Sequence, residues 1–250
     1  MIATFNKVEG KAFAYRIQKI LIKTRMTKTN TKAKISANKL GEYIDSLPHR
    51  RRRIVKDQKY PKGYVVTRYQ GAKKTIIDFF VNGKGDKQKI KTEIERLIVR
   101  SYEKTAFQRQ DNELSIKALQ IFASSKIPKV APYTTSKFES NLNKLVIAGV
   151  DVSIQPDILI KGTIRGREFI GAIKIHISKQ NPLSQTSGKY VAALIHKFLE
   201  TSYQVKVRPE FCISLDIFTG DYFTATRSFK SLRRDLEAAC EEIRLLWDKL

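Results

Sequence analysis

The sequence contains few cysteines, few acidic residues and no long apolar run. Its 250 residues include two cysteines, Cys212 and Cys240, without CxxC spacing or a nearby histidine cluster. This excludes a cysteine-based zinc site or disulfide framework, and we expect both to be small core residues. No apolar segment approaches the length of a membrane span, and Glu9 interrupts the run that a signal peptide would need. We therefore expect a cytoplasmic protein without membrane contact.

Acidic residues are half as common as basic ones. The chain has 24 Asp and Glu against 48 Lys and Arg, which gives a net charge of +24. Residues 1–85 hold 21 basic and 5 acidic residues, about two thirds of the excess. Such a charge favours phosphate polymers, because neutralising phosphates releases counterions. We expect DNA as the partner, with RNA as the alternative polymer and a basic scaffold role as the competing interpretation.

The N-terminal region, residues 1–85, is expected to be mainly helical and to bind nucleic acid. Ser36 is a candidate N-cap for a helix that ends before Pro48, and residues 72–80 have the pattern of another helix. The basic residues between and around them are interleaved with tyrosines. The candidate nucleic-acid contacts in this region are Arg50, Arg51, Arg52, Arg53, Lys59 and Arg68. Four consecutive arginines cannot share one helix face, so at least two should point to solvent or to a polyanion.

Residues 86–250 alternate between helical and strand periodicity. The pattern predicts helices over 86–109, 111–124, 135–148, 187–203 and 228–250, and strands over 151–162, 167–178 and 210–227. Gly149 is expected to end the third of these helices. This order favours an α/β domain with a small central mixed sheet flanked by helices.

Two residues with complementary chemistry lie on the two strands of a predicted hairpin. Asp157 lies near the middle of the first predicted strand, and Lys174 lies on the next, 17 residues later. The link between these strands is short and contains Gly162 and Gly166, which predicts a hairpin that places the two side chains together. Alternation puts Ala172 on the same face as Lys174, and it puts Phe169, Ile173, Ile175 and Ile177 on the opposite, apolar face. An aspartate that holds a metal ion beside a lysine that orients water is half of a phosphodiesterase site.

This arrangement resembles the PD-(D/E)xK nuclease superfamily, which has the restriction-endonuclease-like fold. Pro156-Asp157 matches the first motif, and Ala172-x-Lys174 matches the second except that an alanine replaces the acid. The resemblance spans roughly residues 130–230. It implies a restriction-endonuclease-like core and a DNA nuclease that depends on Mg²⁺ or Mn²⁺. The resemblance implies that Asp157 and residue 172 bind the metal ion and that Lys174 orients the attacking water molecule.

The alanine leaves two interpretations open. Either Ala172 was introduced to inactivate a nuclease, or the chain is a natural pseudo-nuclease that serves as a binding or assembly subunit. The intact strand pattern and the retained Lys174 favour the first. Glu139 occupies the place of an additional metal-binding acid in many members of the superfamily, and a surface glutamate is the alternative.

Further candidates for nucleic-acid contact follow the lysine strand. They are His176, Lys179, Gln185 and Lys189. His176 has a second interpretation as a hydrogen-bonded sheet histidine. A small basic nuclease without a motor domain suggests a role in a larger nucleoprotein complex of a defence system or a mobile element, and it leaves room for a homodimer.

Overall fold

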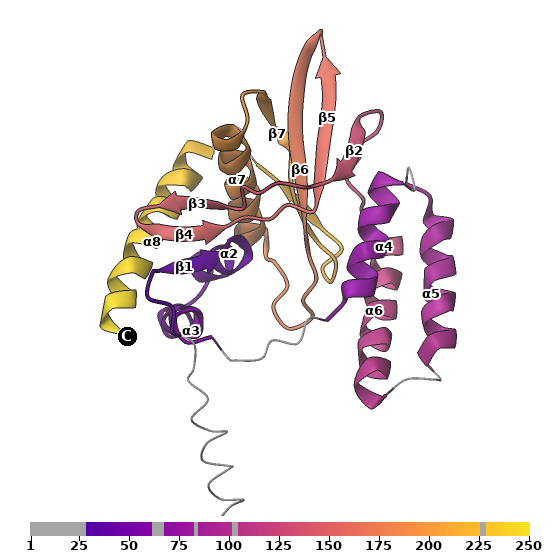
Figure 1. Cartoon of the computed structure of the whole chain (residues 1–250), viewed down its shortest axis with the longest axis horizontal. Helices are drawn as coiled ribbons and strands as arrows, with labels where there is room; N and C mark the ends of the chain where they lie inside the picture. Colours follow the sequence, from indigo (N-terminus) through magenta and orange to yellow (C-terminus); the bar gives the residue numbers. More distant parts are fainter. Residues whose placement is uncertain (1–28, 62–67, 83–84, 102–104, 226–228) are drawn as a thin grey trace, which may run out of the picture.

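The fold is mixed α/β, with a twisted central sheet between two groups of helices (Figure 1). The computed structural model describes residues 29–61, 68–82, 85–101, 105–225 and 229–250. Residues 1–28 of the predicted nucleic-acid-binding region therefore lie outside the described residues. None of the helices in the described ranges is long and apolar enough to cross a membrane.

The central sheet has five strands in the order β2-β5-β6-β7-β8. The strands are β2 (Thr134–Lys137), β5 (Ile158–Ile164), β6 (Arg167–His176), β7 (Lys206–Asp216) and β8 (Tyr222–Thr224). The predicted hairpin is confirmed, because β5 and β6 pair antiparallel and are joined by two residues. Strands β6 and β7 run parallel, which requires a crossover, and α7 (Gln185–Ser202) supplies it. The functional candidates of β6 thus lie in the middle of the sheet.

A smaller sheet joins the N-terminal region to the rest of the chain. It comprises β1 (Lys34–Ser36), β4 (Val150–Ser153) and β3 (Lys144–Ile147), in that order. Strand β1 pairs parallel with β4, and β4 pairs antiparallel with β3. Backbone pairing therefore holds residues from the two predicted regions, 1–85 and 86–250, in one sheet.

Helices cover both faces of the central sheet (Figure 1). One group consists of α2 (Ala37–Ile44), α3 (Pro48–Lys59), α7 and α8 (Phe229–Lys249), and the other of α4 (Gln70–Val81), α5 (Lys87–Ser101) and α6 (Ala106–Ser124). Each group shares an apolar core with one face of the sheet. As predicted, Phe169, Ile173 and Ile175 of β6 share a face, and they pack into the core of the α4–α6 group. The two predicted core cysteines are buried and free.

Serine and threonine side chains begin several helices. The Ser36 hydroxyl accepts a hydrogen bond from the backbone N–H of Lys39, which confirms the predicted start of α2. Thr105 and Gln108 form a capping box that starts α6 at Ala106. Predicted helix 86–109 therefore ends earlier than expected, since its last residues belong to α6.

The predicted helix over 135–148 is wrong. This segment contains β2 and β3, and Glu139 lies exposed in the connection between them. The helical interpretation relied on Gly149 as a C-cap, but Ala148 and Gly149 have φ values of 46° and 81° and form the tight turn between β3 and β4. Two consecutive positive φ values suit a two-residue hairpin, which explains why glycine follows this strand.

The single predicted strand over 151–162 is also wrong. Its first part is β4 of the small sheet and its second part is β5 of the central sheet, separated by residues 154–157. Pro156 lacks the N–H that a continuous ladder would need, and the chain changes sheets there. Asp157 consequently lies immediately before β5 and not near the middle of a strand.

The close approach of β6 and β7 predicts a glycine requirement at position 171. A Cβ atom at Gly171 would lie 2.5 Å from the carbonyl oxygen of Phe211, and backbone cannot move aside cheaply. We expect Gly171→Ala to lower the free energy of unfolding by about 1–3 kcal/mol, measured by urea denaturation. Gly71→Ala is the matched control, because its Cβ would meet open space in α4 and should raise stability by about 0.5–1 kcal/mol. Equal effects of the two substitutions would contradict this packing.

Candidate functional site

Asp157 occupies the junction between the two sheets. Its backbone N–H donates to the carbonyl of Ile173 at 2.8 Å. Its carboxylate oxygen Oδ2 accepts the N–H of Ile175 at 2.7 Å. The side chain thus continues the β5–β6 ladder at the point where the backbone of the first strand turns away. This anchoring leaves the carboxylate 9% exposed.

The ion-pair partner of Asp157 is Lys73, from α4. The Lys73 ammonium lies 2.6 Å from the second carboxylate oxygen, Oδ1, and its side chain is 42% exposed. Both oxygens of Asp157 are therefore engaged. Sequence reasoning missed Lys73, since an exposed lysine in a helical pattern 84 positions away gives no signal that it meets this aspartate.

Lys174 approaches the same carboxylate from β6. Its ammonium donates to the backbone carbonyl of Gln155 at 2.8 Å. Burial lowers the pKa of Lys174 below its ordinary value; the Asp157 carboxylate opposes this shift and the Lys73 ammonium adds to it. The sequence predicted that Asp157 and Lys174 lie together; in the structure the two groups interact electrostatically, while the ion pair of Asp157 is with Lys73. We call Lys73, Asp157 and Lys174 the lysine–aspartate cluster.

Ala172 lies deeper in the fold than its neighbours on the same face. It is fully buried, stands opposite Leu159 and Cys212 in the sheet, and belongs to the core that α7 shares. Ser214, the residue opposite Lys174 on β7, is also fully buried. Its hydroxyl has no hydrogen-bond partner among the residues that the structure describes. A buried hydroxyl group without a hydrogen-bond partner lowers the stability of the fold. The Ser214 hydroxyl is such a group, on the face of the sheet that carries Ala172.

The residues present do not supply a ligand set for Mg²⁺ or Mn²⁺. Ala172 offers no oxygen, and the two oxygens of Asp157 already bind Lys73 and the β6 backbone. Glu139 does not lie on the predicted helix, because its segment connects the strands β2 and β3. Across the described ranges, no three His, Cys, Asp or Glu side chains are placed to hold a metal ion. Divalent cations of this kind need several hard oxygen ligands.

His176 is held at both ring nitrogens. Nε2 lies 2.8 Å from the carbonyl of Asn181, and Nδ1 lies 2.8 Å from the side-chain nitrogen of Asn38. A neutral ring that donates from Nε2 and accepts at Nδ1 satisfies both contacts. Burial is the main cause that lowers the pKa of His176, which agrees with a neutral ring. These contacts favour the sheet-histidine interpretation over nucleic-acid contact.

The predicted basic cluster divides between structural and exposed residues. Arg50 pairs with Glu42, and Arg51 donates to three backbone carbonyls at the end of α2. The Lys59 ammonium donates to the carbonyl of Trp247 at 2.7 Å. These three side chains stabilise the packing of α2, α3 and α8.

Other predicted contacts remain available at the surface. Arg52 and Arg53 are exposed on α3, and within the described ranges neither side chain makes a hydrogen bond or an ion pair. Arg68 is exposed beside Phe107 and donates to Gln110. Lys179 and Gln185 are exposed after β6 and at the start of α7, whereas Lys189 is half-buried on α7.

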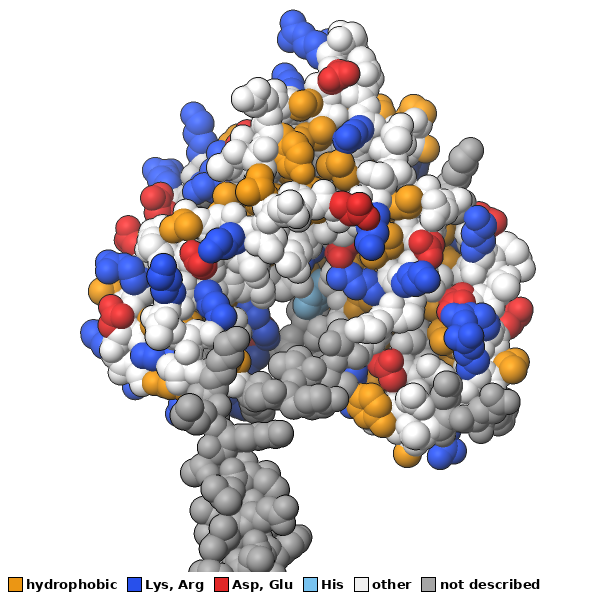
Figure 2. All heavy atoms as spheres, in the orientation of Figure 1, with side chains coloured by type: hydrophobic (Ala, Val, Ile, Leu, Met, Phe, Trp, Pro, Cys, Tyr) orange, Lys and Arg blue, Asp and Glu red, His pale blue; other side chains and the backbone are white. Residues whose placement is uncertain are grey.

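The molecule is hollowed between its two groups of helices. Figure 2 shows this hollow with Lys and Arg side chains on its margins and a histidine side chain inside it. On the α2 side, a pocket of about 180 Å³ lies between α2 and the segment after β6, and its lining includes Lys39, His176 and Asn181. On the α4 side, Lys73 reaches Asp157. Positive side chains from separate elements therefore converge where the layers meet.

Comparison with protein-family models and with curated protein sequences finds no match to this chain. Inference about function therefore depends on the residues and their geometry.

The partial desolvation of Lys174 predicts a pH dependence of stability. Its folded-state pKa lies below the ordinary value of 10.5, so between those two values the unfolded chain binds the extra proton. The free energy of unfolding therefore rises as the pH increases from the folded-state pKa of Lys174 to its ordinary value, and the contribution of Lys174 is smaller below this range. We expect Lys174→Met to remove part of this rise, measured as the free energy of unfolding from pH 7 to 10.5.

The control for that measurement is Lys179→Met, which removes an exposed lysine close in sequence. It should leave the pH dependence of the wild-type protein in place. An identical pH slope for wild type and Lys174→Met would contradict the proposed burial effect.

Proposed function

We propose that this chain is a nucleic-acid-binding protein with a nuclease-like site that does not hydrolyse the phosphodiester bond in its present form. The observation that carries the proposal is the lysine–aspartate cluster, in which the Lys73 ammonium pairs with the Asp157 carboxylate and the Lys174 ammonium interacts with it electrostatically. DNA is the proposed ligand, and RNA is the alternative polymer that the same assays distinguish.

The charge of the cluster supports phosphate binding. Two ammonium groups against one carboxylate leave a net positive charge, and Lys73 is accessible from solvent. The whole chain adds a net charge of +24, which concentrates polyanions near the surface. A phosphate group that approached Lys73 would share it with Asp157, so the ammonium would bridge the ligand and the sheet.

The arrangement of strands supports a restriction-endonuclease-like core as part of this proposal. An antiparallel hairpin brings Asp157 beside Lys174, and a helical crossover leads from the lysine strand to a parallel neighbour. The proposed lack of hydrolytic activity follows from the absence of an acidic residue at position 172. With one engaged carboxylate and an alanine at position 172, the site lacks the oxygen ligands that metal-assisted hydrolysis requires.

A specific observation favours the second candidate, a nuclease inactivated at position 172. The buried Ser214 hydroxyl lacks a partner and lies opposite Lys174, on the face that carries Ala172. A glutamate at 172 would add a carboxylate to that face, where the hydroxyl would donate to it. Both candidates bind DNA. They differ in whether a glutamate at position 172 gives the protein the ability to cut it.

Restoring the acid tests the two candidates. We expect wild type to bind labelled DNA without cutting it, and, for the nuclease, Ala172→Glu to cut in the presence of Mg²⁺ while Ala172→Gln does not. Circular dichroism checks that each variant folds, because position 172 is fully buried. Folded Ala172→Glu that binds but never cuts identifies a pseudo-nuclease. A wild-type chain that binds neither DNA nor RNA would overturn the proposed function.

The contribution of Lys73 is tested by binding. Each phosphate contact changes the slope of log K against log salt by about 0.9, which corresponds to about tenfold between 1 M and 0.1 M salt. We expect Lys73→Gln to weaken DNA binding by about tenfold at 0.1 M salt, since it also leaves the Asp157 carboxylate unpaired. The measurement is fluorescence anisotropy with a labelled duplex.

Lys74→Gln is the matched control for Lys73→Gln. Lys74 is the next residue of α4, is exposed, and carries the same charge, while the ion pair with Asp157 belongs to Lys73 alone in the structure as described. Equal losses for the two variants would show that α4 acts only through its overall charge.

A further inference from the structure

A basic pocket lies at the turn end of the β5–β6 hairpin, apart from the lysine–aspartate cluster. Its volume is about 330 Å³. It is lined by Ile164, Arg165, Arg167, Glu168, Phe169, Lys206 and Arg208. The arginines at positions 165 and 167 come from the hairpin, and the other two basic residues come from the start of β7. We call these seven residues the hairpin pocket.

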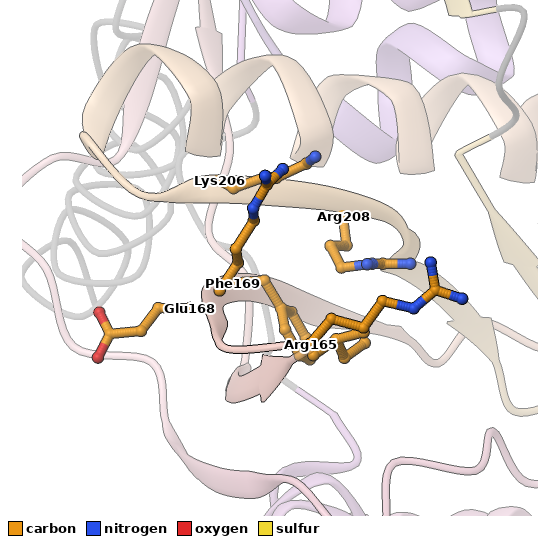
Figure 3. A pocket seen from close by; sticks show the side chains of 7 residues that line it. Arg165, Glu168, Phe169, Lys206 and Arg208 are labelled. Carbon is orange, nitrogen blue, oxygen red and sulfur yellow. The ribbon is translucent and has the colours of Figure 1, made fainter.

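The positive charge of the hairpin pocket is largely uncompensated. Arg165, Arg167 and Lys206 are exposed, and none of their side chains is joined by a hydrogen bond or ion pair to a residue in the described ranges. The guanidinium groups of Arg165 and Arg208 extend to the same side, whereas the carboxylate of Glu168 points away from them (Figure 3).

Arg208 is the exception, because it is already engaged within the protein. Its side chain lies over the ring of Phe169, with 5.8 Å between the guanidinium carbon and the ring centre, and its Nε–H donates to Glu210 at 2.6 Å. Arg208 therefore forms a fixed wall of the pocket, and the three unpaired basic side chains supply the available donors.

The backbone at Arg165 gives a second, independent indication. Arg165 and Gly166 form the two-residue turn between paired residues Ile164 and Arg167, with φ values of 51° and 73°. Turns with two positive φ values favour Asn, Asp or Gly at the first position, because a longer side chain is disfavoured there. An arginine at this position opposes the preference of the turn, and such local strain is typical of residues kept for function.

We propose that the hairpin pocket is a second nucleic-acid contact, which binds backbone phosphates through Arg165, Arg167 and Lys206. This inference rests on the proposed function and adds where the polymer is held. Guanidinium groups suit phosphate because their donors match its oxygens in pairs. The pocket reads phosphate and not bases, since its one aromatic lining residue, Phe169, is 2% exposed and has no free face for stacking.

The lining also distinguishes a nucleic acid from a lipid surface. Binding to a membrane surface combines cations with apolar side chains that enter the lipid. The apolar lining residues here are Phe169, which is buried, and Ile164, which is half-buried. Basic side chains on the turn and on the neighbouring strand instead offer successive contacts to a charged backbone.

The turn makes it possible to separate binding from folding. Arg165→Asn replaces a disfavoured residue by one that the turn prefers, so the variant should melt at the same temperature as wild type or higher. We expect the double variant Arg165→Asn/Arg167→Gln to bind a labelled 20-base-pair duplex more weakly. Its slope of log K against log salt should be shallower by about 1.8, corresponding to two lost phosphate contacts.

Two controls accompany this measurement in the full-length chain. Glu168→Gln removes the negative charge of the pocket and should strengthen binding. Lys249→Asn removes an exposed positive charge near the end of α8 and should leave the slope nearly unchanged. Vesicles containing phosphatidylserine provide the competing anionic surface.

The outcomes separate this inference from the proposed function. Weaker binding and a shallower slope, with an undiminished melting temperature, support the hairpin pocket. A double variant that binds the duplex like wild type overturns the pocket and leaves the proposed function standing. A wild-type chain that binds the vesicles but neither the duplex nor RNA overturns both.

Discussion

The contact on which the site depends is the double engagement of the Asp157 carboxylate. One oxygen accepts the Ile175 N–H and the other pairs with Lys73, so a single side chain connects β6 to α4. A nearly buried carboxylate must be paired and hydrogen-bonded, because desolvation of an unpaired charge is expensive. This contact lies where the chain leaves the small sheet and begins β5. It therefore fixes both the start of the central hairpin and the position of the helix that covers it.

The same engagement limits what the site can do chemically. A carboxylate that already binds an ammonium and a backbone N–H is a poor metal ligand on its own, and Ala172 adds nothing to it. The nearby Lys174 is partly desolvated, which lowers its pKa and makes a nearby anion favourable. These charges support the proposed binding of a phosphate group. Only a second acid on the Ala172 face would alter that balance, and the unpaired Ser214 hydroxyl lies on that face.

Local patterns predicted the parts of the fold that depend on neighbouring residues. The alternation of Phe169, Ile173 and Ile175, the cap at Ser36 and the short hairpin link were all read correctly. Segment 135–148 was misread because a glycine after apolar residues suits both a helix end and a hairpin turn. Residues 151–162 were misread because periodicity shows that a segment is extended but does not show to which sheet it belongs.

The sequence by itself determined the strong positive charge, the two faces of β6 and the proximity of Asp157 and Lys174, because each depends on composition or on residues close along the chain. The tertiary structure alone decided that Lys73 pairs with Asp157, that Arg50, Arg51 and Lys59 are used for packing, and that Ala172 is sealed in a core. These outcomes depend on contacts between residues far apart in sequence. An ion pair or a buried position of that kind leaves no periodic signal, since any exposed-looking lysine in a helix has the same local pattern.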